Sequence, residues 1–159
     1  MKIYDEERFL EDVSALLIAG LPAKIIEIND DKDDGIVLEN IPADRFIENL
    51  DDSILNFEKF VFQGISGISA IGMRGATALD VELFFDIIFV DDQGANSKTV
   101  RKKIQRYTRA MREIINKDFR KLECVSDLTV GSMSPTNLSN PEGNVFYKVA
   151  GIQVKGTIG

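Results

Sequence analysis

Apolar and polar side chains alternate along residues 79 to 90. A period of two is typical of a strand with one buried face. Turn-forming residues follow at 91 to 97, so we expect the strand to end near residue 90. The alternating apolar positions are Leu79, Val81, Leu83, Phe85, Ile87 and Phe89, and the acidic residues between them are Asp80, Glu82 and Asp86.

Beyond this turn the apolar spacing changes from two to between three and four. That spacing predicts an amphipathic helix over about residues 98 to 118. The strand, the turn and the helix together form the expected core of the fold. The apolar residues of the helix are Val100, Ile104, Tyr107, Met111, Ile114 and Ile115.

The N-terminal segment carries a second helical pattern. Asp5 is a suitable N-cap, and the acidic residues after it suit the helix dipole. Gly20 and Pro22 are typical of a helix end, so we expect the helix to stop there. Residues 23 to 28 then have the composition of a strand.

The stretch from residue 29 to residue 63 gives weaker signals. We expect an acidic turn at 29–35, a short strand at 36–38 that pairs back, a helical turn at 42–47 and a strand at 57–63.

Residues 64 to 76 contain four glycines, which argue against a helix. Ile65, Ile68 and Ile71 make this segment too apolar for a solvated linker. We expect a mobile loop or an irregular hairpin that becomes ordered against another surface, such as a neighbouring subunit.

The C-terminal region reads as strand, loop and strand, at 122–133, 135–143 and 145–158. Gly151 and Gly156 are expected to mark bulges in the last strand. Together these elements predict one α+β domain over residues 1–159, with both helices packed on a twisted, mostly antiparallel sheet.

Composition narrows the chemistry. The chain has 159 residues, no histidine and a single cysteine, Cys124. The missing histidine excludes Ser-His-Asp and Cys-His catalysis and His-ligated metals. We therefore expect no catalytic, cofactor-binding or metal-binding residues. The N-terminus does not resemble a signal peptide and the apolar runs are short, so we expect assembly in the cytoplasm without membrane contact.

Three segments resemble known functional motifs. Residues 67 to 74 have the glycine spacing of a phosphate-binding loop, but Met73 replaces the lysine that it needs. Residues 29 to 35 resemble a calcium loop without its bidentate glutamate. Asp80, Glu82 and Asp86 could serve a magnesium-dependent nuclease, although an ordinary exposed or subunit-facing strand surface explains them as well.

Charge is distributed unevenly. The net charge is −7, but residues 98 to 121 hold ten basic and two acidic residues, so the rest of the chain carries −15. The basic face could be solvated, could dock on an acidic surface of another copy or partner, or could contact nucleic-acid phosphates. Lys98, Lys102, Arg106 and Arg109 share this face, and Arg101 and Arg112 flank it.

The order of these elements carries a further indication. It comprises a helix ended by Gly and Pro (5–22), a strand (23–28), a glycine-rich excursion, a long alternating strand (79–90), a helix of the type Thr-x-x-x-x-Ile-x-x-Tyr-x-x-x-Met-x-x-Ile-Ile (99–115) and a C-terminal strand. This order resembles the tail-terminator, or tail-to-head joining, proteins of long-tailed bacteriophages. Residues 30 to 63 match that pattern less well.

The resemblance implies a virion structural protein without enzymatic activity. It would form a ring, expected to be a hexamer, that caps the tail tube, contacts the neck or head-tail connector, and lets DNA pass through its lumen without sequence-specific binding. The alternatives are another neck or head-completion adaptor, a nucleic-acid-binding or nuclease-like protein, and a host-encoded binding module. The candidate interface residues are Lys98, Arg101, Lys102, Arg106, Arg109, Arg112, Ile65, Ile68, Ile71 and Arg74.

Overall fold

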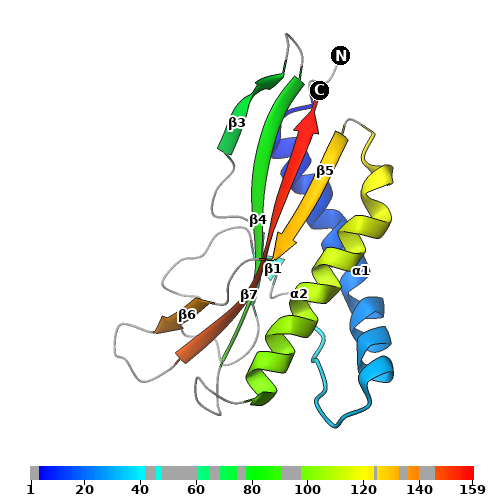
Figure 1. Ribbon diagram of the computed structural model, residues 1–159, viewed down its shortest axis with the longest axis vertical. Helices are drawn as coiled ribbons and strands as arrows, with labels where there is room; N and C mark the ends of the chain where they lie inside the picture. Colours follow the sequence, from blue (N-terminus) through cyan, green and yellow to red (C-terminus); the bar gives the residue numbers. More distant parts are fainter. Residues whose placement is uncertain are drawn as a thin grey trace.

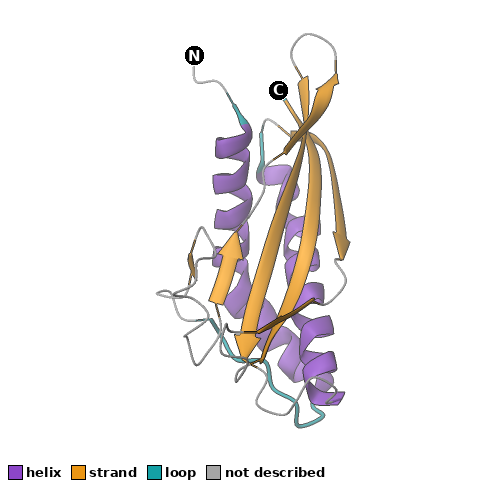
Figure 2. Cartoon of the chain, turned by 90° about the vertical axis from the view of Figure 1, so that its left-hand side faces the viewer, coloured by secondary structure: helices purple, strands orange, loops and turns teal. Residues whose placement is uncertain are grey.

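The computed structural model consists of an antiparallel sheet with helices packed on one of its faces (Figures 1 and 2). This arrangement confirms the α+β class expected from the sequence. The structure describes residues 4–41, 46–47, 61–64, 69–74, 78–90, 98–123, 125–132, 136–139 and 146–159.

The centre of the sheet is a pair of long antiparallel strands. β4 (Ala78–Val90) and β7 (Phe146–Ile158) each contain 13 residues. Their register runs without a shift from Leu79 opposite Ile158 to Val90 opposite Tyr147. The alternation predicted at 79–90 is confirmed, because Val81, Leu83, Phe85 and Ile87 are buried on one face.

Shorter strands extend the sheet on both sides of this pair. β2 (Val61–Gly64) and β3 (Ser69–Arg74) pair with the edge of β4 that faces away from β7. β5 (Val125–Ser132) and β6 (Thr136–Ser139) pair with the edge of β7 that faces away from β4. β1 (Phe46–Ile47) pairs with β2 in the parallel direction, whereas the other described pairs are antiparallel.

The first helix is longer than the sequence suggested. α1 (Glu6–Lys32) continues through Gly20 and Pro22, so the helix end expected there and the strand expected at 23–28 are wrong. Gly20 instead marks the approach of the second helix, since a Cβ at that position would lie 2.9 Å from Ile114 Cγ2. The buried spacing of Leu21, Ile25 and Ile28 outweighs the proline.

Local contacts fix both ends of α1. The Asp5 side chain accepts a hydrogen bond of 3.0 Å from the Arg8 amide, as expected for an N-cap. At the other end Asp33 adopts the left-handed conformation, with φ at 38°. Its amide donates to the Asn29 carbonyl at 3.1 Å and closes the last turn.

Four further expectations fail in the structure. Residues 36–38 form no strand. The side-chain amide of Asn29 hydrogen-bonds both backbone groups of Leu38, at 2.8 and 2.9 Å, in place of the backbone partner that a neighbouring strand would supply. Phe46–Ile47 is a strand where a helical turn was expected. Thr136–Ser139 is a strand within the expected loop. Gly151 and Gly156 mark no bulge in β7, whose register against β4 is unbroken.

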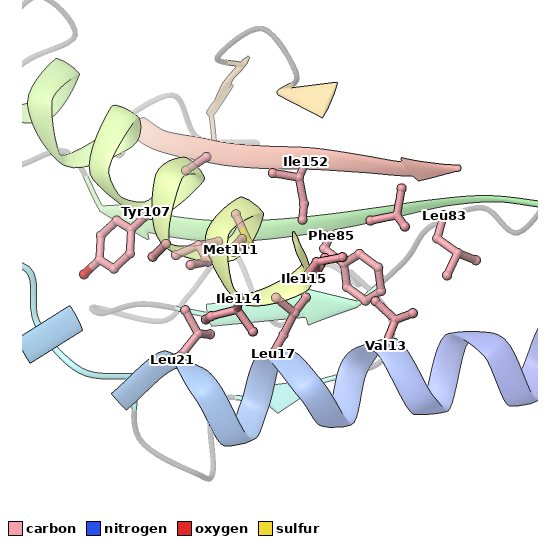
Figure 3. Close-up of a cluster of buried hydrophobic side chains, with 14 of the residues drawn as sticks. Val13, Leu17, Leu21, Leu83, Phe85, Tyr107, Met111, Ile114, Ile115 and Ile152 are labelled. Carbon is pink, nitrogen blue, oxygen red and sulfur yellow. The ribbon is translucent and has the colours of Figure 1, made fainter. Parts of the chain in front are cut away.

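The second helix lies where it was predicted. α2 (Lys98–Asp118) runs into a short 3-10 turn, η3 (Phe119–Lys121). Its apolar face packs between α1 and the sheet, and Figure 3 shows Met111 and Ile115 lying between Leu17 of α1 and Ile152 of β7. The hydrophobic core is therefore a single layer enclosed by two helices and one sheet face.

Gly156 of β7 lies close against Phe9 of α1, and this contact yields a stability prediction. A Cβ there would lie 2.8 Å from Cζ of the fully buried Phe9 ring and 3.3 Å from the Asp127 carbonyl oxygen. We expect Gly156→Ala to lower the free energy of unfolding by about 1–3 kcal/mol through overpacking. Chemical denaturation measures this loss.

The matched control is Gly131→Ala in β5, where an added Cβ meets nothing within 4 Å. We expect that change to be neutral or stabilising by up to about 1 kcal/mol. Equal losses in the two variants would show that the Phe9 contact does not require a glycine.

Candidate functional site

The basic face of α2 binds the acidic segment of its own chain. After α1 ends, residues 33 to 41 run back along α2. Arg106 donates from Nη1 to the Ile36 carbonyl at 2.7 Å and from Nη2 to the Asp34 carboxylate at 2.5 Å. Arg106 is only 6% exposed, so this predicted interface residue is a buried structural anchor.

Neighbouring residues of α2 extend the same contact. Lys102 Nζ lies 3.0 Å from the Asp34 carboxylate. The Tyr107 hydroxyl donates to the Glu39 carbonyl at 2.8 Å. Together with Arg106, these side chains hold an otherwise irregular segment against the helix and satisfy its backbone carbonyls. We call this set of contacts the clasp.

Arg109 belongs to a second group of charges beside the clasp. Its Nε donates to Glu113 at 2.7 Å, and its Nη1 lies 3.4 Å from Asp31. Lys24 of α1 reaches the same Glu113 at 3.4 Å and Glu27 at 2.9 Å. These ion pairs connect α1 to α2 around a shared carboxylate.

The clasp changes the proton affinity of its members. Hydrogen bonds from Arg106 and then Lys102 hold the pKa of the Asp34 carboxyl well below its usual range. The hydrogen bond from Arg109 likewise lowers the pKa of Glu113. Burial raises the pKa of the Tyr107 hydroxyl. Asp34 therefore keeps its negative charge well into the acidic range, and Glu113 keeps its charge to a lower pH than a free glutamate does.

A shallow groove of about 460 Å³ opens over these charges. Asp34 is the acidic member of its lining, and it already contacts Lys102 and Arg106. Arg109 in turn contacts Asp31 and Glu113, so Lys102, Arg106 and Arg109 each already have an acidic partner within the chain. The lining residues are Lys32, Asp34, Lys102, Gln105, Arg106 and Arg109.

The other predicted interface residues are separated into two regions. Lys98, Arg101 and Arg112 occupy exposed positions on α2, outside the clasp. Ile71 and Arg74 belong to β3, on the far edge of the sheet, and Ile71 lies at the register shift between Ala70 and Gly72. Ile65 and Ile68 lie outside the described residues. The structure therefore does not bring the eight described candidates together in one site.

The three carboxylates of β4 also act separately. Asp80 accepts a hydrogen bond of 2.7 Å from the Thr157 hydroxyl. Glu82 lies 3.9 Å from Lys155 Nζ. Burial alone raises the pKa of Asp86 to about 6. Across the described residues, no three His, Cys, Asp or Glu side chains are placed to hold a metal ion together.

Sequence reasoning missed the main acidic partner of the basic helix. Asp34 was assigned to a solvated turn, and Asn29 was not singled out at all. The signal that could have found Asp34 is the acidic run at 30–34, which matches the basic run of α2 in charge. A pairing over a separation of 72 residues, as between Asp34 and Arg106, has no local pattern in the sequence.

The clasp predicts unequal effects of two substitutions on α2. Arg106→Ala removes two hydrogen bonds and leaves the Ile36 carbonyl without its charged donor, so we expect the free energy of unfolding to fall by about 2–3 kcal/mol. Lys102→Ala, at a side chain that is 33% exposed, should have a clearly smaller effect. Guanidinium denaturation of both variants measures the difference, and equal losses would mean that Arg106 is not the anchor.

The raised pKa of Asp86 predicts a pH-dependent stability. Its folded pKa of about 6 exceeds the ordinary value of 3.8, so the native state binds the proton more tightly than the unfolded chain. Stability should then rise as the pH falls from 7 towards 4. Asp86→Asn should raise the free energy of unfolding at pH 7 by about 1–2 kcal/mol and flatten the profile between pH 4 and 6. An unchanged profile in urea titrations would contradict this.

Comparisons with known proteins add no family to this picture. No protein-family model and no curated protein matches the chain. Neither of the two long helices in the described part of the chain is apolar enough to cross a membrane.

Proposed function

We propose that this chain is a structural virion protein that forms a ring at the head-proximal end of a bacteriophage tail. It would end polymerisation of the tail tube and join the tail to the head. The observation that carries the proposal is the order α1, β4, α2, β5 and β7, with both helices on one face of a long antiparallel strand pair. That order retains the main features of the tail-terminator resemblance, although the strand expected at 23–28 is absent.

The face of the sheet opposite the helices supports an assembling protein. The side chains of Asp80, Glu82, Phe84 and Asp86 point away from α1 and α2 and are partly buried. Within the described residues no helix covers this face (Figure 2). A subunit of a ring must present more than one such surface, since each copy contacts two neighbours and a tube.

The contacts of the charged residues disfavour the enzymatic alternative. A magnesium-dependent nuclease needs carboxylates that converge on one ion. Asp80 instead accepts a hydrogen bond from Thr157, and Glu82 forms an ion pair with Lys155. Nucleic-acid binding by α2 loses support as well, because Arg106 and Lys102 already hold Asp34. A different neck or head-completion adaptor remains the alternative of the same class.

The ring would have defined partners in the virion. The ring, with six copies as the expected number, would contact the tail tube protein on one side and the neck or connector protein on the other. DNA would pass through the lumen without sequence-specific contacts. The protein would be assembled in the host cytoplasm and would end in the virion.

The mass of the purified full-length protein tests this function. Native mass spectrometry should give a closed oligomer, with six copies expected, and negative-stain microscopy should show rings with a central hole. When the protein is added to polymerising tail tube protein, the tubes should become shorter and uniform in length. A strict monomer that retards DNA in a salt-dependent manner would overturn the proposal and favour the nucleic-acid-binding alternative.

A further inference from the structure

The outer face of α1 is apolar where a surface helix is normally charged. Residues 13 to 23 contain no charged side chain, which corresponds to about 16 Å of helix. The inward side of this stretch is the core described above. Its outward side consists of exposed positions that are also apolar, namely Ala15, Ile18, Ala19, Pro22, Ala23 and, one turn further on, Ile26. We call these six residues the α1 stripe.

Exposure of the stripe is substantial. Ile26 is 62% exposed and Ile18 is 40% exposed, and both appear among the largest exposed apolar side chains of the described residues. α1 has little separation of polar and apolar sides, whereas α2 is strongly amphipathic. A helix that is apolar around its circumference is normally covered on both sides. The outer side of α1 therefore needs a partner.

Charges beside the stripe indicate the chemistry of that partner. Glu27 and Asp30 lie at exposed positions near the C-terminal end of α1, and Glu27 stays 61% exposed although it pairs with Lys24. A helix C-terminus favours basic side chains, so this placement is unfavourable for α1 alone. The contact that would relieve it is a surface carrying exposed lysine or arginine.

The first turns of α2 carry the opposite charge, which is likewise unfavourable for the helix dipole. A helix N-terminus favours acidic side chains, yet the first turn of α2 has none, and Lys98 and Arg101 are exposed there. The described residues form no ion pair with these two side chains. Figure 1 shows that this end of α2 and the C-terminal end of α1 lie at the same end of the molecule. A neighbouring copy placed beside the first would bring the two charge sets to the same height.

We infer that the α1 stripe is the surface that binds the exposed basic edge of α2, at Lys98 and Arg101, from the next copy of this chain. The alanines leave room for the aliphatic stems of these two residues to lie across the stripe, while their charged groups reach Glu27 and Asp30. The contact joins two different surfaces, so it repeats head to tail and can close into a ring. The inference rests on the proposed function and assigns the surfaces that build its ring.

A single charged substitution in the stripe provides the first test. Ile26→Glu would place an unpaired carboxylate in the contact, so we expect the protein concentration for half-assembly to rise at least about tenfold, as measured by native mass spectrometry and light scattering. The matched control is Val37→Glu, at an apolar residue that is 59% exposed and lies outside both helices. The control should assemble like the wild type, and circular dichroism should show both variants folded.

Charge exchange provides the second test and identifies the partner surface. One variant carries Glu27→Lys and Asp30→Lys, and the other carries Lys98→Glu and Arg101→Glu. All four changes suit the helix dipoles, and the Lys24–Glu27 pair that the first variant loses is exposed on the Glu27 side, so folding should be preserved. Each variant alone should fail to form rings, whereas an equimolar mixture should form rings in which the two variants alternate.

The outcomes separate this inference from the proposed function. If the wild type forms rings and Ile26→Glu forms them equally well, the stripe is not the contact and only this inference fails. If the Lys98 and Arg101 variant alone still assembles, the stripe pairs with another copy of itself and the assigned partner surface is wrong. If the wild type is monomeric at every concentration and in the presence of tail tube protein, the ring and this contact fail together.

Discussion

The pairing of β4 with β7 is the constraint on which the rest of the structure depends. Their twelve register pairs determine which side chains of each strand face the helices. A slip of one residue would turn Val81, Leu83 and Phe85 away from the core and expose them. Among the described residues the helices have no other apolar surface of this length to cover, so their placement follows from this register. The shorter strands only extend an arrangement that is already complete.

The charges of α2 serve the fold before they serve any partner. The segment after α1 has no strand or helix of its own to satisfy its backbone, and buried carbonyls without donors are costly. Arg106 and Tyr107 supply donors to the carbonyls of Ile36 and Glu39. The basic face that looks available for docking in the sequence is thus partly consumed within the chain. Only its exposed outer residues remain available to a partner.

The parts of the fold that could be predicted from sequence are those set by local periodicity. The alternation at 79–90 and the helical spacing of α2 identified their elements because each reports one buried face. Gly20 and Pro22 led to a wrong prediction of a helix end. A glycine is typical both of helix ends and of close helix packing, and only the position of Ile114 distinguishes the two. The clasp could not be predicted for a related reason, since Asp34 and Arg106 come into contact only after the fold has formed. The sequence identified Lys98 and Arg101 as basic residues of the helix. It could not distinguish them from basic residues of the same helix that are buried, such as Arg106.

Several features at one end of the molecule are unusual for the surface helices of an isolated chain. α1 is apolar on a side that no described element covers, its C-terminal end carries exposed acidic residues, and the adjacent end of α2 carries exposed basic ones. Each feature is unfavourable for an isolated chain, and departures from local consistency tend to occur where a protein functions. One neighbouring copy would resolve all three at once, because it would cover the stripe and neutralise both helix ends. Water solvates the exposed charges but leaves the apolar stripe uncovered, so a neighbouring copy is the single contact that would account for all three features.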